Sequence, residues 1–378
     1  MPRKRVMISI NGSWNIYNFR AGLIRSLSQN GFDILAVAPQ DDYSARLDQL
    51  GCQHIALPMD KNGTSLLHDG LLFLRYLRLL QRERPDVLLG YTIKPNIYGS
   101  IAAHLFGIPV INNISGLGTV FIRETWVTMF VKLLYRLALR PSRTVFFQNE
   151  DDRDLFIRLR LVRRGRASLL PGSGVDLDKF RPQPVLPGAN TSALPIFLLI
   201  ARLLWDKGVG EYVEAARLVK KQFPNARFQI LGFLDVENRS AISRSQMQTW
   251  VGEEIVEYLG MVDDVRPIIA AAGCVVLASY YREGTPRVLL EAAAMAKPLI
   301  TTDAPGCRDV VDDGVNGYLC AARDHKDLAE KLIAFLSLDP VKREQMGLAS
   351  RAKAETDYDE RIVVTRYFDA IESAIGMN

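Results

Sequence analysis

The sequence predicts an α/β protein made of two doubly wound domains, each a parallel sheet with helices on both faces. Three observations support this fold class. Short apolar segments alternate with longer amphipathic ones along the chain, which is typical of parallel sheets with helical crossovers. The alternation stops in a proline-rich stretch at 179–195 and then starts again. The length of 378 residues fits about two to three domains of ordinary size.

The first domain is predicted to span residues 1–185. Its expected strands are short runs of branched apolar residues at 6–10, 34–38, 54–57, 87–91, 109–113, 144–147 and 167–171. Helical spacing of apolar residues predicts helices at 19–30, 44–50, 66–83, 96–106 and 126–139. Strands joined by helices in this way pair in parallel, so their carboxyl ends meet at one edge of the sheet.

The second domain is predicted to span residues 186–358. Its expected strands lie at 196–201, 227–231, 256–259, 274–278 and 299–302. Its expected helices lie at 212–223, 265–272, 286–296 and 325–336, and two further helical segments, 341–355 and 359–376, close the chain. Ligands of doubly wound sheets bind beyond the carboxyl ends of the strands, so we expect a binding cleft between the two domains.

Composition excludes several classes of protein. Apolar residues make up 48% and charged residues 24%, which is incompatible with a disordered chain, a collagen or a disulfide scaffold. The four cysteines and four histidines lack the spacing of metal ligands. No segment reads as a signal peptide or a spanning helix. The sequence therefore predicts a cytoplasmic protein with reduced thiols.

Charge is divided unevenly along the chain. Residues 1–185 carry 25 Lys or Arg and 15 Asp or Glu, a net charge of +10, whereas the remainder carries 22 and 27, a net charge of −5. A basic half suits a phosphate-bearing partner, such as nucleic acid, an anionic membrane surface or a phosphorylated substrate. The alternative is a solvated basic face without a partner.

A motif in the second domain follows a predicted strand and opens a predicted helix. It runs from Ser279 to Glu291 and contains Glu283, Gly284, Thr285 and Pro286. We expect Thr285 to be the N-cap and Pro286 the first helical residue, because these residue types favour those positions. Unpaired backbone N–H groups at such a helix start attract a phosphate. A solvated or capping role for the two glutamates is the alternative.

A second motif also follows a strand of this domain. Arg202 and Lys207 lie five residues apart in a loop that ends in Gly208. A planar guanidinium and a compact ammonium can converge on one diphosphate. Taken alone, the two cations can equally be exposed loop residues. Both motifs stand at strand exits of one domain, and this joint placement favours a binding site.

Together these motifs resemble the retaining glycosyltransferases of family 4, whose architecture is GT-B: two Rossmann-like domains that face a deep interdomain cleft. The segments 171–182, 259–265 and 306–317 resemble that family's linker, base-contacting loop and late acidic segment. Segments 94–99, 114–119 and 201–205 resemble bacterial N-acetylgalactosaminyltransferases that extend undecaprenyl-diphosphate-linked sugars. The resemblance implies transfer of a sugar from a UDP-sugar, without a metal or another cofactor. With this architecture, the C-terminal helix, about 359–378, packs back on the first domain.

The resemblance also implies roles for individual residues. Arg202 and Lys207 would hold the donor diphosphate, Glu283 the sugar hydroxyls and Glu291 the ribose. These implied catalytic residues are Arg202, Lys207 and Glu283. The implied donor-binding residues are Gly12, Ser13, Met261, Val265, Gly284, Thr285, Pro286, Arg287 and Glu291. The implied acceptor-binding residues are Tyr17, Arg20, Lys94 and Asn96. Lys94 departs from the pattern, because several relatives carry a histidine there, and the loop 11–14 has fewer glycines than usual.

The basic first domain is expected to bind the acceptor, an undecaprenyl-diphosphate-linked saccharide, at the inner face of the cytoplasmic membrane. The helix 126–140 is apolar with cations at four-residue spacing, so it can lie on an anionic leaflet or serve as a core helix with one solvated face. With this membrane partner, we expect no nucleic acid to bind.

Two rival functions are a Rossmann oxidoreductase and a basic binding module with a degenerate catalytic half. No dinucleotide fingerprint and no P-loop is present, and the intact charged motifs argue against the binding module. Asp176 and Asp178 form an Asp-x-Asp pair, but they stand at the start of the linker, so we expect no metal site there.

Overall fold

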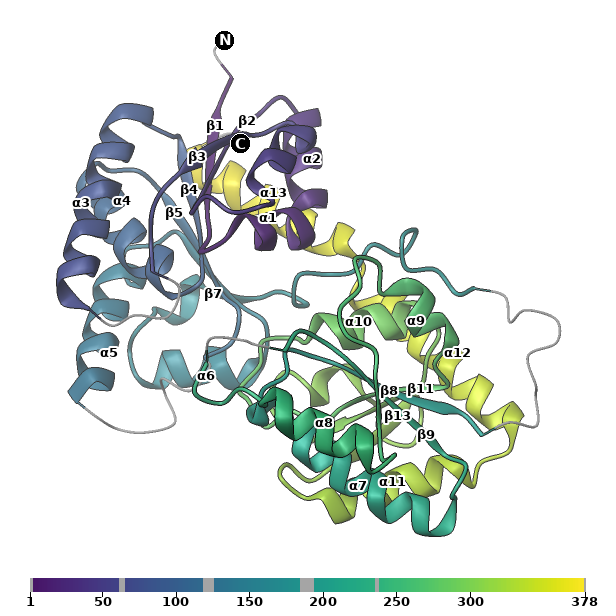
Figure 1. The fold of residues 1–378 in the computed structure, drawn as a ribbon. Coiled ribbons are helices and arrows are strands. Elements are labelled where there is room, and N and C mark those ends of the chain that lie inside the picture. The colour runs from purple at the N-terminus through teal and green to yellow at the C-terminus, as the bar shows by residue number, and fades with distance from the viewer. Residues whose placement is uncertain (1–2, 61–64, 118–125, 184–193, 235–237, 377–378) are drawn as a thin grey trace. The chain divides into compact units, whose positions relative to one another are not determined.

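A computed structural model of the chain describes residues 3–60, 65–117, 126–183, 194–234 and 238–376. The chain forms two compact units. Unit 1 comprises Met1–Ser173 and Glu360–Asn378, and unit 2 comprises Gly174–Asp359. Each unit is built around a parallel sheet of its own (Figure 1).

Unit 1 contains a seven-stranded sheet in the order β3-β2-β1-β4-β5-β6-β7. Its strands are β1 Arg5–Ser9, β2 Asp33–Ala38, β3 Gln53–Ala56, β4 Val87–Tyr91, β5 Val110–Ile114, β6 Thr144–Phe147 and β7 Ala167–Leu169. Its α-helices are α1 Ser13–Phe19, α2 Ala21–Gln29, α3 Leu66–Glu83, α4 Ser100–Leu105, α5 Trp126–Leu139, α6 Glu150–Arg158 and α13 Glu360–Ile375. The segments Ser44–Leu50 and Pro95–Gly99 form a 3₁₀ and a π-helix.

Both faces of this sheet are buried, which explains why its strands are continuous apolar runs. Along β1, Val6 and Ile8 pack in the core beneath α2 and α13, whereas Met7 packs on the opposite face beneath α3 and α4 (Figure 1). Helix α13 contributes Tyr367 to the first of these cores, and the Asn113 side-chain amide donates to its hydroxyl at 2.8 Å. The final helix of the chain is therefore part of unit 1.

Unit 2 contains a six-stranded sheet in the order β10-β9-β8-β11-β12-β13. Its strands are β8 Ile196–Ile200, β9 Arg227–Leu231, β10 Glu257–Tyr258, β11 Cys274–Leu277, β12 Leu299–Thr302 and β13 Gly317–Cys320. Its α-helices are α7 Val209–Gln222, α8 Arg244–Gly252, α9 Arg266–Ala271, α10 Arg287–Ala294, α11 His325–Leu336 and α12 Pro340–Asp357. One core lies between the sheet and α7, α8 and α11, and a second lies between the sheet and α9, α10 and α12.

The boundary between the units differs from the predicted position at 185/186, since the structure places it between Ser173 and Gly174. The physical reason is that the segment after Ser173 packs on unit 2. The backbone N–H of Val175 donates to the carbonyl of Tyr358 at 2.8 Å, and Val175 and Phe180 are buried in the core that contains α10 and α12. Prolines mark where helices and strands end, whereas the unit boundary lies where the chain stops packing on unit 1 and begins to pack on unit 2.

Four of the described α-helices and strands were absent from the sequence prediction: α1, α6, α8 and β13. Helix α6 is polar, but Asn149 caps it by accepting the N–H of Asp152 at 2.8 Å. Helix α8 begins after Ser243, whose hydroxyl accepts the N–H of Gln246 at 3.1 Å. These capping residues are readable signals where the apolar period is weak. Strand β13 has only four residues, and a short edge strand carries little pattern of its own.

Candidate active site

Two loops of unit 2 bring the predicted charged residues together. One loop follows β8 and carries Arg202 and Lys207, and the other follows β11 and carries Glu283. Strands β8 and β11 are paired in parallel, so both loops leave the same edge of the sheet. Separation in the chain is therefore no obstacle to contact between these side chains.

Backbone contacts hold the two loops against each other. The carbonyl of Asp206 accepts the N–H groups of Tyr280 at 3.1 Å and of Tyr281 at 3.0 Å. Gly208 has a φ of +72°, and a Cβ added there would lie 1.9 Å from the carbonyl oxygen of Ala278. Only glycine permits this backbone approach, which places Lys207 directly beside the second loop.

Lys207 and Glu283 form an ion pair between Nζ and Oε1. Only 11% of the Lys207 side chain and 14% of the Glu283 side chain are exposed. The hydroxyl of Ser279 also donates to Glu283 Oε1, at 2.9 Å. A charged side chain that is mostly shielded from water is costly to leave without a partner. A ligand that separates Lys207 from Glu283 must therefore offer an anionic group to the lysine and hydrogen-bond donors to the glutamate.

Tyr281 joins the two cations, and the sequence analysis missed it. The Lys207 ammonium lies 4.8 Å from the centroid of the Tyr281 ring. Burial raises the pKa of the Tyr281 phenol, and the nearby Arg202 guanidinium opposes that rise. Arg202 itself is exposed. A cation over an aromatic face is attracted to the ring quadrupole, so Tyr281 helps to hold the Lys207 ammonium in place. The signal in the sequence was the aromatic pair Tyr280–Tyr281, which only Arg282 separates from Glu283.

The segment after Glu283 begins α10, although one residue later than predicted. Pro286 is the N-cap, with φ −64° and ψ 118°, and Arg287 is the first helical residue. Proline fixes φ but not ψ, and here an extended ψ keeps it outside the helix. No side chain caps this end. Gly306 supports the segment from below, since a Cβ added to it would lie 1.5 Å from the carbonyl oxygen of Gly284.

Glu291 and Arg287 form a second pair, one turn apart on α10. Arg287 Nε donates to Glu291 Oε1 at 3.0 Å, and about one sixth of each side chain is exposed. Burial raises the pKa of Glu291, and the charges of Arg287 and Lys179 oppose that rise. The carboxylate is therefore oriented by its neighbour, and a ligand hydroxyl would have to share it with Arg287.

Met261 and Val265 follow strand β10 in the chain. In the sheet, β9 lies between β10 and β8, the strand that precedes Arg202. Met261 is 67% exposed, and Val265 is the N-cap of α9. Gly260, just before them, has a φ of +73°, and its carbonyl accepts the N–H of Gly232 at 2.9 Å. The loop is thus tied to the end of β9 and presents Met261 to solvent, which suits a flat apolar ligand surface.

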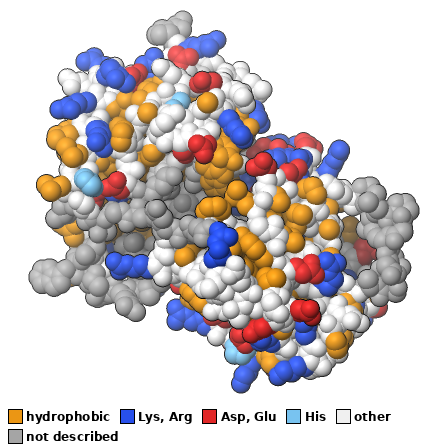
Figure 2. Space-filling view, viewed as in Figure 1, with side chains coloured by type: hydrophobic (Ala, Val, Ile, Leu, Met, Phe, Trp, Pro, Cys, Tyr) orange, Lys and Arg blue, Asp and Glu red, His pale blue; other side chains and the backbone are white. Residues whose placement is uncertain are grey.

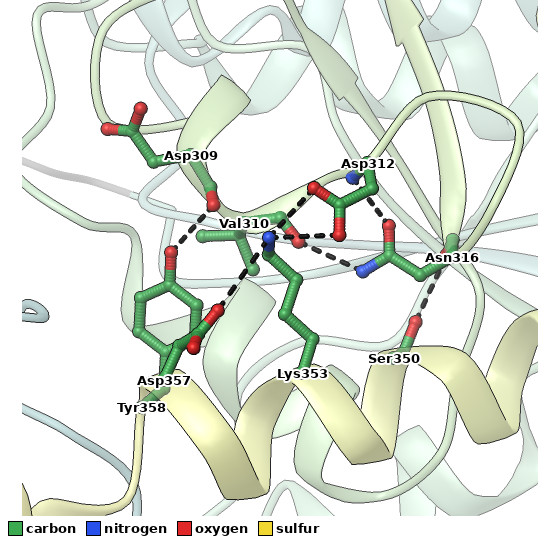
Figure 3. Close-up of polar contacts among 8 residues, drawn as sticks. All are labelled: Asp309, Val310, Asp312, Asn316, Ser350, Lys353, Asp357 and Tyr358. Carbon is green, nitrogen blue, oxygen red and sulfur yellow. Dashed lines mark hydrogen bonds and ion pairs between the residues drawn. The ribbon is translucent and has the colours of Figure 1, made fainter.

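The late acidic segment is anchored from behind by α12. Figure 3 shows Lys353 between two carboxylates, with its Nζ 2.8 Å from Asp312 Oδ1 and 3.8 Å from Asp357 Oδ2. Asn316 donates to the carbonyl of Val310 at 3.0 Å, and its own carbonyl accepts the hydroxyl of Ser350 at 3.0 Å (Figure 3). This anchor belongs to the same segment as Gly306, so it indirectly supports Gly284.

Three of the predicted residues of unit 1 have side chains committed to internal contacts. The hydroxyl of Ser13 is buried and lies 3.0 Å from that of Ser44. Arg20 is 5% exposed, with its guanidinium carbon 4.4 Å from the centroid of the Tyr91 ring. Asn96 is 1% exposed and donates to the carbonyl of Asn113 at 2.9 Å. Ser13 was predicted to bind the donor, and Arg20 and Asn96 the acceptor. These roles stay predictions, and the structure shows that all three side chains already contact groups inside unit 1.

The other predicted residues of unit 1 are placed differently. Lys94 Nζ lies 2.8 Å from Asp69 Oδ1, and both side chains are less than 15% exposed. The hydroxyl of Tyr98 donates to Asp69 Oδ2 at 3.0 Å. Tyr17 is partly exposed, and Gly12 is the buried N-cap of α1. Lys94 resembles Lys207 in being a mostly shielded cation that a carboxylate holds.

Asp176 of the Asp-x-Asp pair caps a turn in the structure. Asp176 Oδ1 accepts the N–H groups of Asp178 at 3.0 Å and of Lys179 at 2.8 Å, so it caps a turn. Within the described residues, no three His, Cys, Asp or Glu side chains are grouped so that they could hold a metal ion.

Comparison with known proteins assigns the family. The model of the Glycosyl transferase 4-like domain matches residues 18–172, and the model of Glycosyl transferases group 1 matches residues 194–337. Together they cover most of both units. The chain is a glycosyltransferase that contains both of these family domains. The family predicted from Arg202, Lys207, Glu283 and Glu291 is therefore confirmed.

Individual glycosyltransferases extend this result. The chain is 28% identical to the N,N'-diacetylbacillosaminyl-diphospho-undecaprenol alpha-1,3-N-acetylgalactosaminyltransferase of Campylobacter jejuni, over 96% of each chain. It is 25% identical to the UDP-Gal:alpha-D-GlcNAc-diphosphoundecaprenol alpha-1,3-galactosyltransferase of Escherichia coli, over 71% of each. Among solved structures it is similar to HepE of Anabaena in complex with UDP-glucose, with a TM-score of 0.79, 17% identity and coverage of 98% and 99%. The predicted GT-B fold of two Rossmann-like domains is confirmed.

Proposed function

We propose that this glycosyltransferase moves a sugar from a UDP-sugar to a saccharide carried on undecaprenyl diphosphate, in the synthesis of a bacterial surface polysaccharide or protein-linked glycan. The transferred sugar is an N-acetylhexosamine or a hexose. Support comes from the relatives, two of which are named for diphospho-undecaprenol acceptors and one of which was solved with UDP-glucose.

The convergence of Arg202, Lys207 and Glu283 beside Tyr281 carries the proposal. In the structure the Lys207 ammonium is neutralised by Glu283. A donor diphosphate offers Lys207 a stronger anionic partner, and the released carboxylate can then accept hydrogen bonds from the sugar hydroxyls. Arg202, held near Tyr281, supplies a second positive charge. Donor binding and the assembly of the sugar site are thus one event.

The reaction proceeds with retention and without a metal ion. The bond from the anomeric carbon to the phosphate oxygen breaks, and the bond to the acceptor hydroxyl oxygen forms on the same face of the sugar. The departing phosphate oxygen takes the acceptor proton, so no separate carboxylate base is needed. Arg202, Lys207 and the uncapped start of α10 stabilise the negative charge that develops on UDP.

Unit 1 binds the acceptor and lies on the anionic inner face of the cytoplasmic membrane. Helix α5 buries Tyr135 and Leu139 in the core, but Met129 and Leu133 are 67% and 52% exposed, and Arg136 is exposed among them. On the face in Figure 2, hydrophobic side chains lie next to basic ones over unit 1, and acidic side chains are visible over both units. An amphipathic helix with cations suits a lipid surface. No described helix has the length and apolar character needed to cross a membrane.

A transfer assay tests the function. Purified protein is mixed with a panel of UDP-sugars and short-chain polyprenyl-diphosphate-linked N-acetylhexosamines, and products are identified by mass spectrometry and by the anomeric configuration of the new bond. We expect one donor to be transferred with retention. Inversion of the anomeric centre would overturn the mechanism, and transfer only from GDP- or ADP-sugars would overturn the donor assignment.

A further inference from the structure

A cluster of aromatic side chains lies at the carboxyl edge of the unit 1 sheet. Trp14 and Tyr17 belong to α1, directly after β1, and Tyr43 belongs to the loop after β2. Strands β1 and β2 are paired in parallel, so both segments leave the same edge of the sheet. We call Trp14, Tyr17, Tyr43 and the neighbouring Arg46 the aromatic surface. Tyr17 is one of the acceptor-binding residues that the family resemblance implies, whereas Trp14, Tyr43 and Arg46 are not among them.

The rings of the aromatic surface remain accessible while packing on one another. The centroids of Tyr17 and Tyr43 are 5.7 Å apart, with an angle of 52° between the rings. The Arg46 guanidinium carbon lies 4.8 Å from the centroid of Tyr43. Trp14 is 48% exposed and meets Phe19 edge-on at 5.1 Å. A half-exposed tryptophan supported by a second ring offers a firm, flat apolar face.

Hydrogen bonds beneath the surface hold its two segments in register. Asp41 Oδ2 accepts the N–H groups of Ser13 at 2.8 Å and of Trp14 at 3.3 Å. The hydroxyl of Ser13 is 3.0 Å from that of Ser44 and 3.1 Å from the carbonyl oxygen of Pro39. Because these links tie the start of α1 to the loop after β2, the rings are positioned before any ligand arrives. Binding to a preorganised surface loses little conformational entropy.

Charge indicates what kind of ligand fits there. Helix α1 has no Lys, Arg, Asp or Glu, and the loop beside it carries Asp41 and Asp42. The positive charge of Arg46 is directed to the Tyr43 ring. With one arginine and two neighbouring aspartates, the aromatic surface has no net positive charge that would favour phosphates or anionic lipids. A neutral pyranose ring matches the surface, because the C–H face of a sugar stacks on aromatic rings while its hydroxyls reach the polar side chains around them.

We propose that the aromatic surface is the subsite for the saccharide of the acceptor, with Trp14 as the main stacking face. This inference rests on the proposed function, since it assumes that unit 1 receives a lipid-diphosphate-linked saccharide. It assigns the sugar recognition that Arg20 and Asn96, which are buried, cannot supply.

The test measures acceptor and donor steps separately in the full chain. The probe is a farnesyl-diphosphate-linked N-acetylhexosamine, and the variants are Trp14→Ala, Trp14→Phe and Tyr43→Ala. Loss of one stacked ring is expected to raise the acceptor KM about tenfold in Trp14→Ala. Trp14→Phe keeps a flat face and should stay within about threefold. Affinity for UDP and hydrolysis of the donor without acceptor should not change in any variant.

Phe106→Ala is the matched control. Phe106 is 44% exposed in the same unit, but it follows α4 and so lies toward the other edge of the sheet. An acceptor KM that is unchanged in both alanine variants, as in this control, would overturn the inference.

Tryptophan fluorescence separates this inference from the proposed function. The probe should change the emission of the wild type but not of Trp14→Phe, whether or not any donor is turned over. An identical change in both proteins would overturn the aromatic surface even in an active transferase. The same change on vesicles of anionic lipid without saccharide would identify a membrane contact instead. Absence of transfer from every donor, with the saccharide response intact, would refute the proposed function alone.

Discussion

At the carboxyl edge of unit 2, two oppositely charged side chains from different loops pair with each other, whereas at the same edge of unit 1 the predicted residues Ser13 and Asn96 are neutral and buried. Lys207 and Glu283 form an ion pair at the start of two loops, and a charged ligand can replace either partner. Ser13 and Asn96 instead bond to groups inside their own unit. The comparison teaches that residue type alone does not identify a binding site. A better indicator is a charged side chain whose partner a ligand can replace.

Replacing Lys207 should have the largest effect, since it removes one side of the exchangeable pair. Lys207→Ala is expected to lower kcat about 100-fold, because one charge that stabilises the departing diphosphate is lost. Affinity for UDP should fall as well. Steady-state kinetics and calorimetric titration with UDP check this.

Lys221→Ala serves as the control, because Lys221 is an exposed lysine at the end of α7 in the same unit. Wild-type turnover in Lys207→Ala would remove the diphosphate assignment. A fall of similar size in Arg202→Ala would show that the two cations act on the same group.

Disturbing the contact between the two loops should be next in size. A Cβ at Gly208 would lie 1.9 Å from the Ala278 carbonyl oxygen, at a φ of +72°. Gly208→Ala must therefore push the loops apart, and a displacement of about 1 Å at a reacting centre can cost up to 100-fold in rate. We expect activity to fall between about 10- and 100-fold.

Gly252→Ala is the matched control, since nothing lies within 4 Å of a Cβ added there. Circular dichroism should show both variants folded. Equal activity in the two would mean that loop register is unimportant for catalysis.

Sequence indicated which charged residues of unit 2 lie together better than it indicated which polar residues of unit 1 are accessible, for a physical reason. Arg202, Lys207, Glu283 and Glu291 are charged residues at strand exits, and their chemistry is visible without coordinates. Tyr281 was missed because an aromatic residue beside a charged motif usually reads as core. On the acceptor side, Arg20 and Asn96 looked polar and available, but burial is decided by tertiary packing.

Fold prediction failed in a similar way at particular places. Helix α6 lacks the periodic spacing of apolar residues, so its N-cap residue Asn149 is the main sequence feature that predicts a helix there. The unit boundary was placed at prolines, although the packing of Val175 and Phe180 on unit 2 decides it. For α6 the N-cap decided the structure, and for the unit boundary contacts with residues far away in the chain decided it. In neither case did the local pattern of apolar residues or prolines predict the outcome.

Charge reversal on α5 should affect the acceptor step but not the donor step. Replacing Lys132, Arg136 and Arg140 by Glu is expected to weaken sedimentation with anionic liposomes at low salt, since each cation near such a surface contributes roughly 1 kcal/mol. Activity on a lipid-linked acceptor should fall about tenfold, while hydrolysis of the donor is maintained.

The control changes Lys221, Lys326 and Lys342 of unit 2 to Glu, which alters net charge equally. Sedimentation of the α5 variant at the wild-type level would mean that this helix serves only the core of unit 1.

The anchor shown in Figure 3 should have a smaller effect, because it supports the donor site indirectly. Lys353 is 17% exposed and holds both carboxylate oxygens of Asp312, at 2.8 and 3.0 Å. Lys353→Met should lower the free energy of unfolding by about 1 kcal/mol. Activity should fall only a few-fold, through the segment that carries Gly306. Lys342→Met, which removes a 3.8 Å exposed pair on the same helix, should change neither urea midpoint nor activity.

Removal of divalent cations should have the smallest effect of all. In the proposed mechanism Arg202 and Lys207 supply the positive charge that a metal ion would otherwise bring. Turnover in EDTA should therefore equal turnover in Mn²⁺ within error. The Asp-x-Asp pair offers no competing explanation as it stands, because Asp176 Oδ1 already accepts the N–H groups of Asp178 and Lys179. Complete loss of activity in EDTA, restored by Mn²⁺ and abolished by Asp176→Asn, would mean that this turn opens to bind metal. Arg202 and Lys207 would then only assist the metal ion. The donor site would have to include Asp176, and the comparison between the two units would no longer rest on the Lys207–Glu283 pair alone.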